Sequence, residues 1–310
     1  MKKILLTTFA LFAFAFNSIL CRMALGTDEI DAASFTAVRL ASGAVVLVVI
    51  SFFFIRKKGG NLSGSEGVSS RGEMSAGGAE NTLHTGRVSA FKTHGSWFSA
   101  FFLVAYAICF SFAYLGLTTA TGALILFGSV QMTMIAIALF RGERPRALEW
   151  RGLVVAVCGL VYLVFPGLSS PPLFNSIMMA AAGAAWGFYT LRGRGSTDPL
   201  ADTAGNFVRT LPLALLVLIP FLPETHLSSR GFVLAILSGA LASGVGYTVW
   251  YAALKFHTST RAAVLQLAVP VIAAVGGVVF LSETANSRLV IAAALILGGI
   301  GLTISGHKRS

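Results

Sequence analysis

Long apolar stretches, separated by short polar segments, make up most of the chain. A helix needs about 20 apolar residues to cross a hydrocarbon core of about 30 Å. Ten stretches meet this length, although the fifth requires Glu149 and Arg151 to lie at the membrane surface. The pattern predicts transmembrane helices near residues 4–25, 32–55, 97–117, 119–140, 147–165, 172–191, 203–222, 231–254, 258–281 and 289–305.

Composition supports an all-α membrane protein. The 310 residues have a mean hydropathy of +0.80 and only 11% charged residues, against about 25% in soluble domains. Ten core helices of a soluble protein would lack the polar surface that they need. Cys21, Cys109 and Cys158 lie in apolar stretches without metal-ligand spacing, so we expect no metal and no cofactor.

The first apolar stretch must be weighed against a signal peptide, because Lys2 and Lys3 precede it. It is longer than a usual signal core, and no small-x-small cleavage site follows. A lipoprotein signal at Cys21 is disfavoured because bulky Leu20 precedes the cysteine. We therefore expect an uncleaved first span.

Positive charges concentrate on one side of the predicted membrane. With ten spans, only Arg22, Arg230 and Arg288 lie outside the spans on the other side. The positive-inside rule then predicts a multi-pass protein of the cytoplasmic (inner) membrane with both termini in the cytoplasm. The net charge of +11 is explained by this bias, so we expect a lipid bilayer and no nucleic acid as partners. The oligomeric state stays open.

Residues 57–96 are rich in Gly and Ser and poor in apolar side chains, which is typical of a flexible linker. A phosphate-binding loop is the alternative, but no Gly spacing leads into a Lys-Ser or Lys-Thr pair. The charge pattern assigns this linker to the cytoplasm.

The two halves of the chain resemble each other. A shift of 140 residues aligns Thr118 with Thr258 and Glu143 with Glu283, and a shift of 170 aligns further positions of the first two spans. Because each half holds five spans, the second half must be inverted in the membrane, as in many secondary transporters. The expected architecture is two inverted-topology five-helix repeats. The expected division is helices 1–2 in residues 1–56, a linker in 57–96, helices 3–5 in 97–170 and the second repeat in 171–310.

The second half resembles the EamA repeat of the drug/metabolite transporter superfamily. The resemblance rests on Pro270, Glu283 and the pair Gly298-Gly299, and "WGFYTLRGR" from Trp186 resembles the start of a repeat. It implies a transporter of small metabolites or drug-like solutes, without naming the substrate. The sequence departs from the family at "FAFNSILCR", where relatives often have Trp-Gly, and in its long linker.

Ionisable residues within the spans are candidates for function because their desolvation is costly. Arg39 and Arg209 lie six or seven residues inside their spans. Their side chains could extend to the near membrane surface, pair with the end of another helix, or contact an anionic group of the solute. Inversion of the halves predicts the ion pairs Arg39–Glu283 and Arg209–Glu143 as opposite gates. Capping of loops by the two glutamates is the alternative.

Polar and aromatic residues at depth are the better guide to a substrate pocket. Each is also compatible with helix packing. Pro270 interrupts the ninth predicted span, which favours a cavity near Gln266. The candidate substrate-binding residues are Asn17, Tyr106, Gln131, Trp186, Tyr189, Tyr247, Trp250 and Gln266.

The chemistry of the spans favours transport over catalysis. No Asp or Glu lies in the middle of a span, which disfavours proton coupling through a buried carboxylate and favours a facilitator, exchanger or exporter. A membrane-embedded enzyme would need a facing nucleophile and base or a metal cluster, and a scaffold would need a folded soluble domain. We therefore expect a non-enzymatic transporter of a small molecule that works by alternating access.

Overall fold

The computed structural model describes residues 2–63, 95–140, 147–165, 170–193, 196–254, 256–257 and 265–307. Within these ranges the regular secondary structure is helical throughout. The first half of the chain contributes α1 (Lys2–Leu25), α2 (Ala32–Ser63), α3 (Trp97–Tyr114), α4 (Thr119–Phe140) and α5 (Ala147–Val164). The second half contributes α6 (Leu173–Gly193), α7 (Pro199–Leu218), η1 (Ile219–Glu224), α8 (Ser229–Ile236), η2 (Leu237–Val245), α9 (Gly246–Leu254), α11 (Ala268–Leu281) and α12 (Ser287–His307).

The helices follow the predicted apolar stretches. In the described residues, seven are long and apolar enough to cross a membrane, and the apolar parts of α11 and α12 are shorter. Helix α2 continues to Ser63, so helix replaces the first residues of the predicted linker. The rest of that linker, residues 64–94, lies outside the described residues.

The outer surface of the helix bundle is apolar. Phe12, Phe53 and Val279 expose 50%, 63% and 67% of their surface, and many other large apolar side chains do the same. Soluble monomers rarely expose contiguous apolar surface on this scale. A hydrocarbon environment removes the cost of this exposure, so the fold is that of an integral membrane protein.

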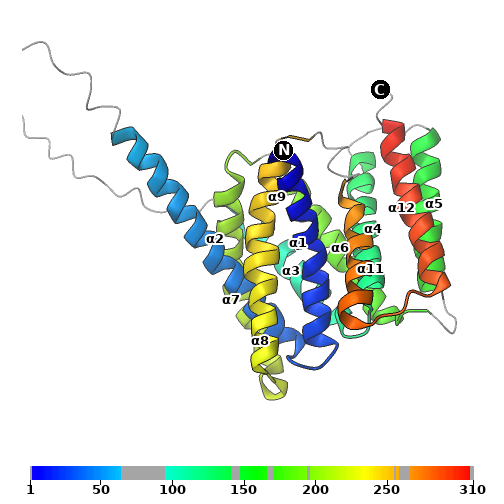
Figure 1. Ribbon diagram of the computed structural model, residues 1–310, viewed down its shortest axis with the longest axis horizontal. Helices are drawn as coiled ribbons and strands as arrows, with labels where there is room; N and C mark the ends of the chain where they lie inside the picture. The colour runs from blue at the N-terminus through cyan, green and yellow to red at the C-terminus, as the bar shows by residue number, and fades with distance from the viewer. Residues whose placement is uncertain are drawn as a thin grey trace, which may run out of the picture.

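The chain returns to the end at which it starts. Helix α1 begins and α12 ends at the same end of the bundle (Figure 1), which we call the terminal end; the opposite end is the far end. At the far end, Arg22 near the end of α1 donates to the carbonyl of Tyr114 at the end of α3. There, too, Arg288 at the start of α12 donates to the carbonyl of Tyr162 near the end of α5. Helices α1 and α3 thus run in the same direction, whereas α5 and α12 run in opposite directions.

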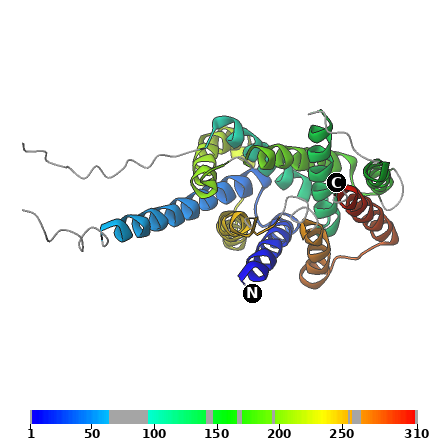
Figure 2. The same ribbon diagram turned by 90° about the horizontal axis from the view of Figure 1, so that it is seen from above.

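The two halves interlock rather than stand apart. Helix α1 packs on η2, α9 and α11 of the second half, while α6 packs on α3 and α4 of the first. Helices α2 and α7 also pack together, and α5 lies beside α12 at one edge of the bundle (Figures 1 and 2). The α5–α12 contact depends on glycine, because a Cβ on Gly299 would lie 2.5 Å from the carbonyl oxygen of Gly152.

Local sequence explains where several helices begin. The side chains of Ser96, Asp198 and Ser228 accept hydrogen bonds from backbone amides in the first turns of α3, α7 and α8, as N-cap residues do. Pro270 follows a break in the ninth predicted span, because a turn at Leu267 separates helical residues 265 and 266 from α11. It lies in the first turn of α11, where a missing amide hydrogen removes no helical bond.

A π-helix, η2, interrupts the rod formed by α8, η2 and α9. Its wider turn is supported by Ser243, whose hydroxyl donates to the carbonyl of Ser238 at 3.0 Å. The small residues in this segment allow close packing on α2: a Cβ on Gly239 would lie 2.0 Å from the carbonyl oxygen of Arg39. Short π-helical segments frequently occur at functional sites, and this one lies directly beside Arg39.

Candidate functional site

The guanidinium of Arg39 lies in the interior of the bundle. Arg39 is the eighth residue of α2, which places it roughly 10 Å from the helix start at about 1.5 Å per residue. Only 2% of its surface is exposed. Its Nη2 donates to the hydroxyl of Tyr106 on α3 at 3.0 Å, and its Nε donates to the hydroxyl of Ser243 on η2 at 3.4 Å.

A chain of buried hydrogen bonds continues from this arginine across the interface of the halves. The amide of Asn17 on α1 donates to the hydroxyl of Tyr106 at 3.3 Å. The amide oxygen of Asn17 in turn accepts a hydrogen bond of 2.7 Å from Ser238. Four helices, α1, α2, α3 and the η2 rod, are therefore joined through one polar network.

A small cavity borders this network near the middle of the bundle. Its volume of about 20 Å³ holds a single water molecule. The rings of Tyr106 and Trp186 lie 5.0 Å apart, and those of Trp186 and Tyr247 lie 4.8 Å apart. The lining residues are Phe14, Asn17, Ser18, Tyr106, Phe110, Leu126, Phe127, Trp186, Ala242 and Tyr247.

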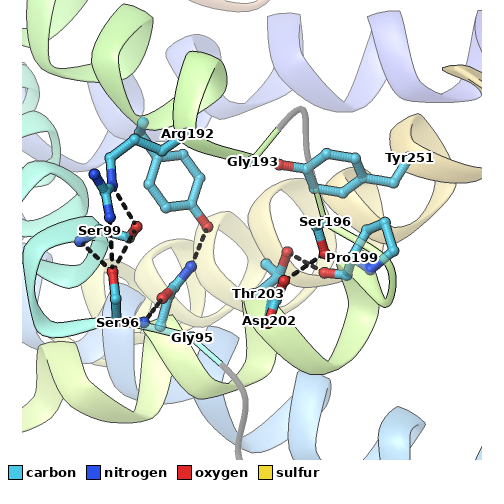
Figure 3. Close-up of a pocket in the computed structure, with 12 residues that line it drawn as sticks. Gly95, Ser96, Ser99, Arg192, Gly193, Ser196, Pro199, Asp202, Thr203 and Tyr251 are labelled. Atoms are coloured by element: carbon cyan, nitrogen blue, oxygen red, sulfur yellow. Dashed lines mark hydrogen bonds between the residues drawn. The ribbon is translucent and has the colours of Figure 1, made fainter.

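A larger vestibule of about 250 Å³ opens at the terminal end (Figure 3). On one wall, Arg192 near the end of α6 donates to the hydroxyl of Ser99 at 3.2 Å. On another wall, Asp202 in the first turn of α7 accepts a hydrogen bond from Ser196. Tyr251 of α9 also lines the vestibule. The vestibule is thus polar and carries both signs of charge.

Two stacked aromatic rings separate the vestibule from the central cavity. Trp186 lines the cavity and Tyr189 lines the vestibule. Their ring centroids lie 5.5 Å apart on α6. Tyr189 also accepts a hydrogen bond of 3.4 Å from the amide of Asn206 on α7. We call these two rings the partition between the vestibule and the cavity.

The far end is closed by a cluster of polar contacts between the halves, which we call the far-end seal. The carboxylate of Glu283, after α11, accepts hydrogen bonds from the backbone amide of Thr119 at 2.9 Å and from its hydroxyl at 3.1 Å. Its Oε1 also lies 3.6 Å from Nε of Arg22. The side chains of Arg22 and Glu283 are only 23% and 12% exposed, so the contact is largely shielded from water.

The predicted pair between Arg39 and Glu283 is wrong in this conformation. Glu283 instead contacts Arg22 and Thr119 at the helix ends, whereas Arg39 lies deeper and faces Tyr106. Arg209 donates to the carbonyl of Gly205 at 2.9 Å, one turn away on its own helix. Glu143, its predicted partner, lies outside the described residues, so that pair stays a prediction.

The structure gathers only part of the predicted substrate-binding set at the cavity. Asn17, Tyr106, Trp186 and Tyr247 line it, and Tyr189 lines the vestibule instead. The ring of Trp250 meets Phe14, a lining residue, edge-on at 5.7 Å.

Two predicted glutamines lie apart from the described cavity lining. Gln131 lies on α4, one turn from Phe127, and is 4% exposed. Its amide nitrogen has no hydrogen-bond partner among the described residues. Gln266 is buried just before α11 and does not line the cavity or the vestibule.

Sequence reasoning missed several residues of the site. Ser238 and Ser243 were not among the predicted site residues, although both hydroxyls join the polar network. Arg22 was counted as a charge outside the spans, and its contact with Glu283 was not foreseen. The contact between Arg22 and Glu283 could have been expected from their positions, because both lie near helix ends on the same predicted side of the membrane.

Comparison with known proteins decides the family. A model of the EamA-like transporter family matches residues 173–305. An uncharacterized transporter of Archaeoglobus fulgidus is 30% identical over 221 residues, or 66% of this chain and 74% of that protein. The chain belongs to the EamA-like transporter family. An uncharacterized protein of Pseudomonas aeruginosa is similar to this EamA-like protein over nearly its whole length, with 43% identity across 98% of the chain and 95% of the relative.

More distant similarities add a named function and a fold. The threonine/homoserine exporter RhtA of Escherichia coli is 30% identical over 185 residues. This match covers 57% of the EamA-like chain and 61% of the exporter, which is less than two thirds of its length. A crystal structure that is 18% identical superposes with a TM-score of 0.57 over 95% of both chains, which shows a shared fold.

Proposed function

We propose that this protein is a secondary transporter that moves a small organic solute across the cytoplasmic membrane by alternating access. The observation that carries the proposal is the central cavity between the halves. Its walls combine aromatic rings from both halves with a few polar groups, which is the composition expected of a small-molecule site. Family membership points in the same direction, toward a transporter rather than an enzyme.

The proposed architecture is ten spans in two inverted five-helix repeats. In this arrangement α1 corresponds to α6, the α8–α9 rod corresponds to α3, and α11 corresponds to α4. The contacts of α1 with the rod and with α11 should therefore have counterparts between α6 and α3 and between α6 and α4, and both sets occur. The contacts α2–α7, α4–α11 and α5–α12 each correspond to themselves. Such paired contacts are what a pseudo-two-fold axis in the membrane plane produces.

The proposed orientation places the terminal end in the cytoplasm, as the positive charges predict. The vestibule then opens inward, while the far-end seal closes the external side. The shift of 170 residues in the internal repeat aligns Arg22 with Arg192. Arg22 holds the far-end seal and Arg192 lies in the vestibule wall, so the two arginines would serve opposite ends of one pathway.

The proposed mode of transport is export or facilitated exchange. No carboxylate lines the central cavity within the described residues, which disfavours proton coupling at the substrate site. The similarity to an amino-acid exporter supports export and a substrate of amino-acid size. The electrochemical gradient of the solute itself would then supply the driving force.

Uptake into proteoliposomes tests the proposed function. The purified full chain is reconstituted and offered a labelled panel that contains L-threonine, L-leucine, benzoate, glucose and putrescine, with and without a pH gradient. We expect at least one solute to exchange faster than into protein-free vesicles, at a rate that does not depend on the pH gradient. No exchange of any panel solute would overturn the proposal.

A matched pair of variants tests the site. Trp186→Ala removes a cavity wall, whereas Trp150→Ala removes a tryptophan that is 48% exposed on the outer surface of α5. We expect the first to lower transport at least about tenfold, the factor that corresponds to 1.4 kcal/mol, and the second to leave it unchanged. Equal effects of the two variants would contradict the assignment of the cavity.

A further inference from the structure

The buried charge of Arg39 has no carboxylate beside it in the described residues. The ion pairs found there join Arg22 to Glu283, His226 to Asp28 and Arg230 to Glu29. Removal of an arginine charge from water costs several kcal/mol unless partners replace the lost hydration. A buried arginine without an acidic partner therefore requires an explanation.

The hydrogen bonds of Arg39 leave one nitrogen unmatched. A guanidinium carries five N–H donors, of which the one on Nε reaches Ser243 and one on Nη2 reaches Tyr106. Nη1 is buried and has no hydrogen-bond partner among the residues that the structure describes. The rings of Tyr106 and Phe110, with centroids 5.1 and 4.8 Å from the guanidinium carbon, stabilise the charge but accept no conventional hydrogen bond. Both N–H donors of Nη1 thus remain unused in the interior of the bundle.

The neighbouring Tyr106 shares a hydrogen bond with the hydroxyl of Tyr247, and its hydrogen can instead go to a charged acceptor, which binds more strongly. A tyrosine hydroxyl has two lone pairs and one hydrogen. Arg39 and Asn17 both donate to this oxygen, so the remaining interaction of the hydroxyl is donation of its own hydrogen. Tyr106 lines the cavity, and Arg39 lies one hydrogen bond behind it. The polar side of the cavity therefore offers hydrogen-bond donors and a positive charge to an acceptor.

The backbone holds this arginine in place. Gly239 of η2 lies so close to Arg39 that no side chain fits between them, and Ser243, one π-helical turn away, contacts the guanidinium. Apolar residues of similar volume would stabilise such a position at least as well as a lone buried charge. The arrangement instead resembles a preorganised anion site, in which the charge is oriented before the ligand arrives.

We propose that Arg39 and Tyr106 bind the carboxylate of the transported solute, which makes the substrate a small organic acid or amino acid. This inference rests on the proposed transport function. The carboxylate accepts hydrogen bonds from Nη1 of Arg39 and from the Tyr106 hydroxyl, while Phe14, Trp186 and Tyr247 contact the apolar remainder. Because the closed cavity holds only about 20 Å³, the solute binds when the partition at Trp186 moves.

Direct binding to the purified full chain tests this site separately from transport. The probes are two matched pairs, L-leucine with L-leucinamide and benzoate with benzamide, and the readout is the shift in melting temperature with ligand concentration. We expect at least one carboxylate to stabilise the protein while its amide does not. Arg39→Met should raise the dissociation constant of that carboxylate at least about 30-fold, as expected for loss of one partner of a buried charge pair.

Three further variants distinguish loss of the carboxylate site from loss of the folded protein. Arg39→Lys retains the charge and should keep the preference for the carboxylate over the amide. Tyr106→Phe removes one donor with little change in volume and should raise the dissociation constant about tenfold, the effect of one hydrogen bond to a charged group. Arg151→Met removes an exposed arginine at the start of α5 and should change nothing.

The outcomes separate the two proposals. Equal stabilisation by carboxylate and amide, absence of any carboxylate-dependent shift, or an unchanged preference in Arg39→Met would each overturn the anion site. Transport of an uncharged or cationic solute that no carboxylate inhibits would overturn it too, while transport itself would stand. Absence of transport together with Arg39-dependent carboxylate binding would overturn the transport function and retain the site.

Discussion

Gly239 shows how one small residue determines the position of a charged one. It lies in the π-helical part of the α8–α9 rod, and its Cα faces the backbone of α2 at Arg39. A Cβ at this position would lie 2.0 Å from the carbonyl oxygen of Arg39 and 2.1 Å from the hydroxyl of Ser42. The nearest obstacle is backbone, which cannot rotate away as a flexible side chain does.

Gly239→Ala is therefore expected to force α2 and η2 apart. Overpacking in a close interface typically costs about 1–3 kcal/mol, so the melting temperature should fall and carboxylate binding should weaken together. Gly298→Ala is the matched control, because nothing lies within 4 Å of a Cβ there and alanine favours the helix. Thermal unfolding in detergent compares the two. A Gly239→Ala protein as stable as Gly298→Ala would contradict the close packing.

The position of a residue within a span predicts its depth in the membrane better than it predicts which neighbouring helix its side chain faces. The depth of Asn17, Tyr106, Trp186 and Tyr247 was sufficient to predict them as a group, because the cavity lies where their helices cross. The predicted pair of Arg39 with Glu283 is not formed in this conformation because α2 faces α3, α7 and η2. Glu283 follows α11, which packs on α1 and α4. A single sequence does not reveal which helices pack against each other.

The far-end seal joins three helices from both halves. Glu283 follows the left-handed Ser282 (φ 54°) that ends α11, and its carboxylate caps the first turn of α4 at Thr119 while it faces Arg22 of α1. Separation of these ends exposes a carboxylate, a guanidinium and a helix N-terminus at once. The seal thus contributes to the free-energy difference between the conformation seen here and one that opens at the far end.

Glu283→Gln should loosen this seal. Hydrogen bonds to a charged group contribute about 1.5–3 kcal/mol, so its loss should raise the population open at the far end at least about tenfold. Cys21, fully buried beside Arg22, serves as the reporter in a background that lacks Cys109 and Cys158. A membrane-impermeant maleimide applied from outside should label it faster in Glu283→Gln. Glu224→Gln, at an exposed site in η1, is the control, and equal labelling rates would contradict the seal.

Helical elements were predicted well and their irregularities poorly. Apolar stretches determine where a helix can lie in a membrane, and each predicted stretch contains one. The π-helix at Leu237–Val245 was not predicted, because the apolar pattern reveals neither its close packing on α2 nor the hydrogen bond from Ser243 to the carbonyl of Ser238. Pro270 indicated a break in the ninth predicted span, but the sequence did not reveal that the break lies at Leu267, three residues before the proline.

At the scale of the whole molecule, the terminal end carries the vestibule, and the charge pattern predicts that this end faces the cytoplasm. Reporter fusions after Lys92 and Ser310 should both be active only in the cytoplasmic sense, because an even number of crossings separates these points from each other and from the N-terminus. Fusion after Leu227, which lies between η1 and α8, is the control and should report the external side. External activity at Lys92 or Ser310 would reverse the proposed orientation.

The lone charge of Arg39 has a consequence for the membrane in which the protein lies. A transport pathway through a membrane could also conduct protons and sodium ions, and this leakage would lower the proton and sodium gradients across the membrane. A fixed positive charge in a surrounding of low dielectric constant raises an electrostatic barrier against every small cation. Because Arg39 is buried with no acidic residue within 4 Å in the described part of the chain, its field at the adjacent cavity is not cancelled locally. If the proposed carboxylate site is correct, the same guanidinium would also oppose the leakage of cations through the cavity.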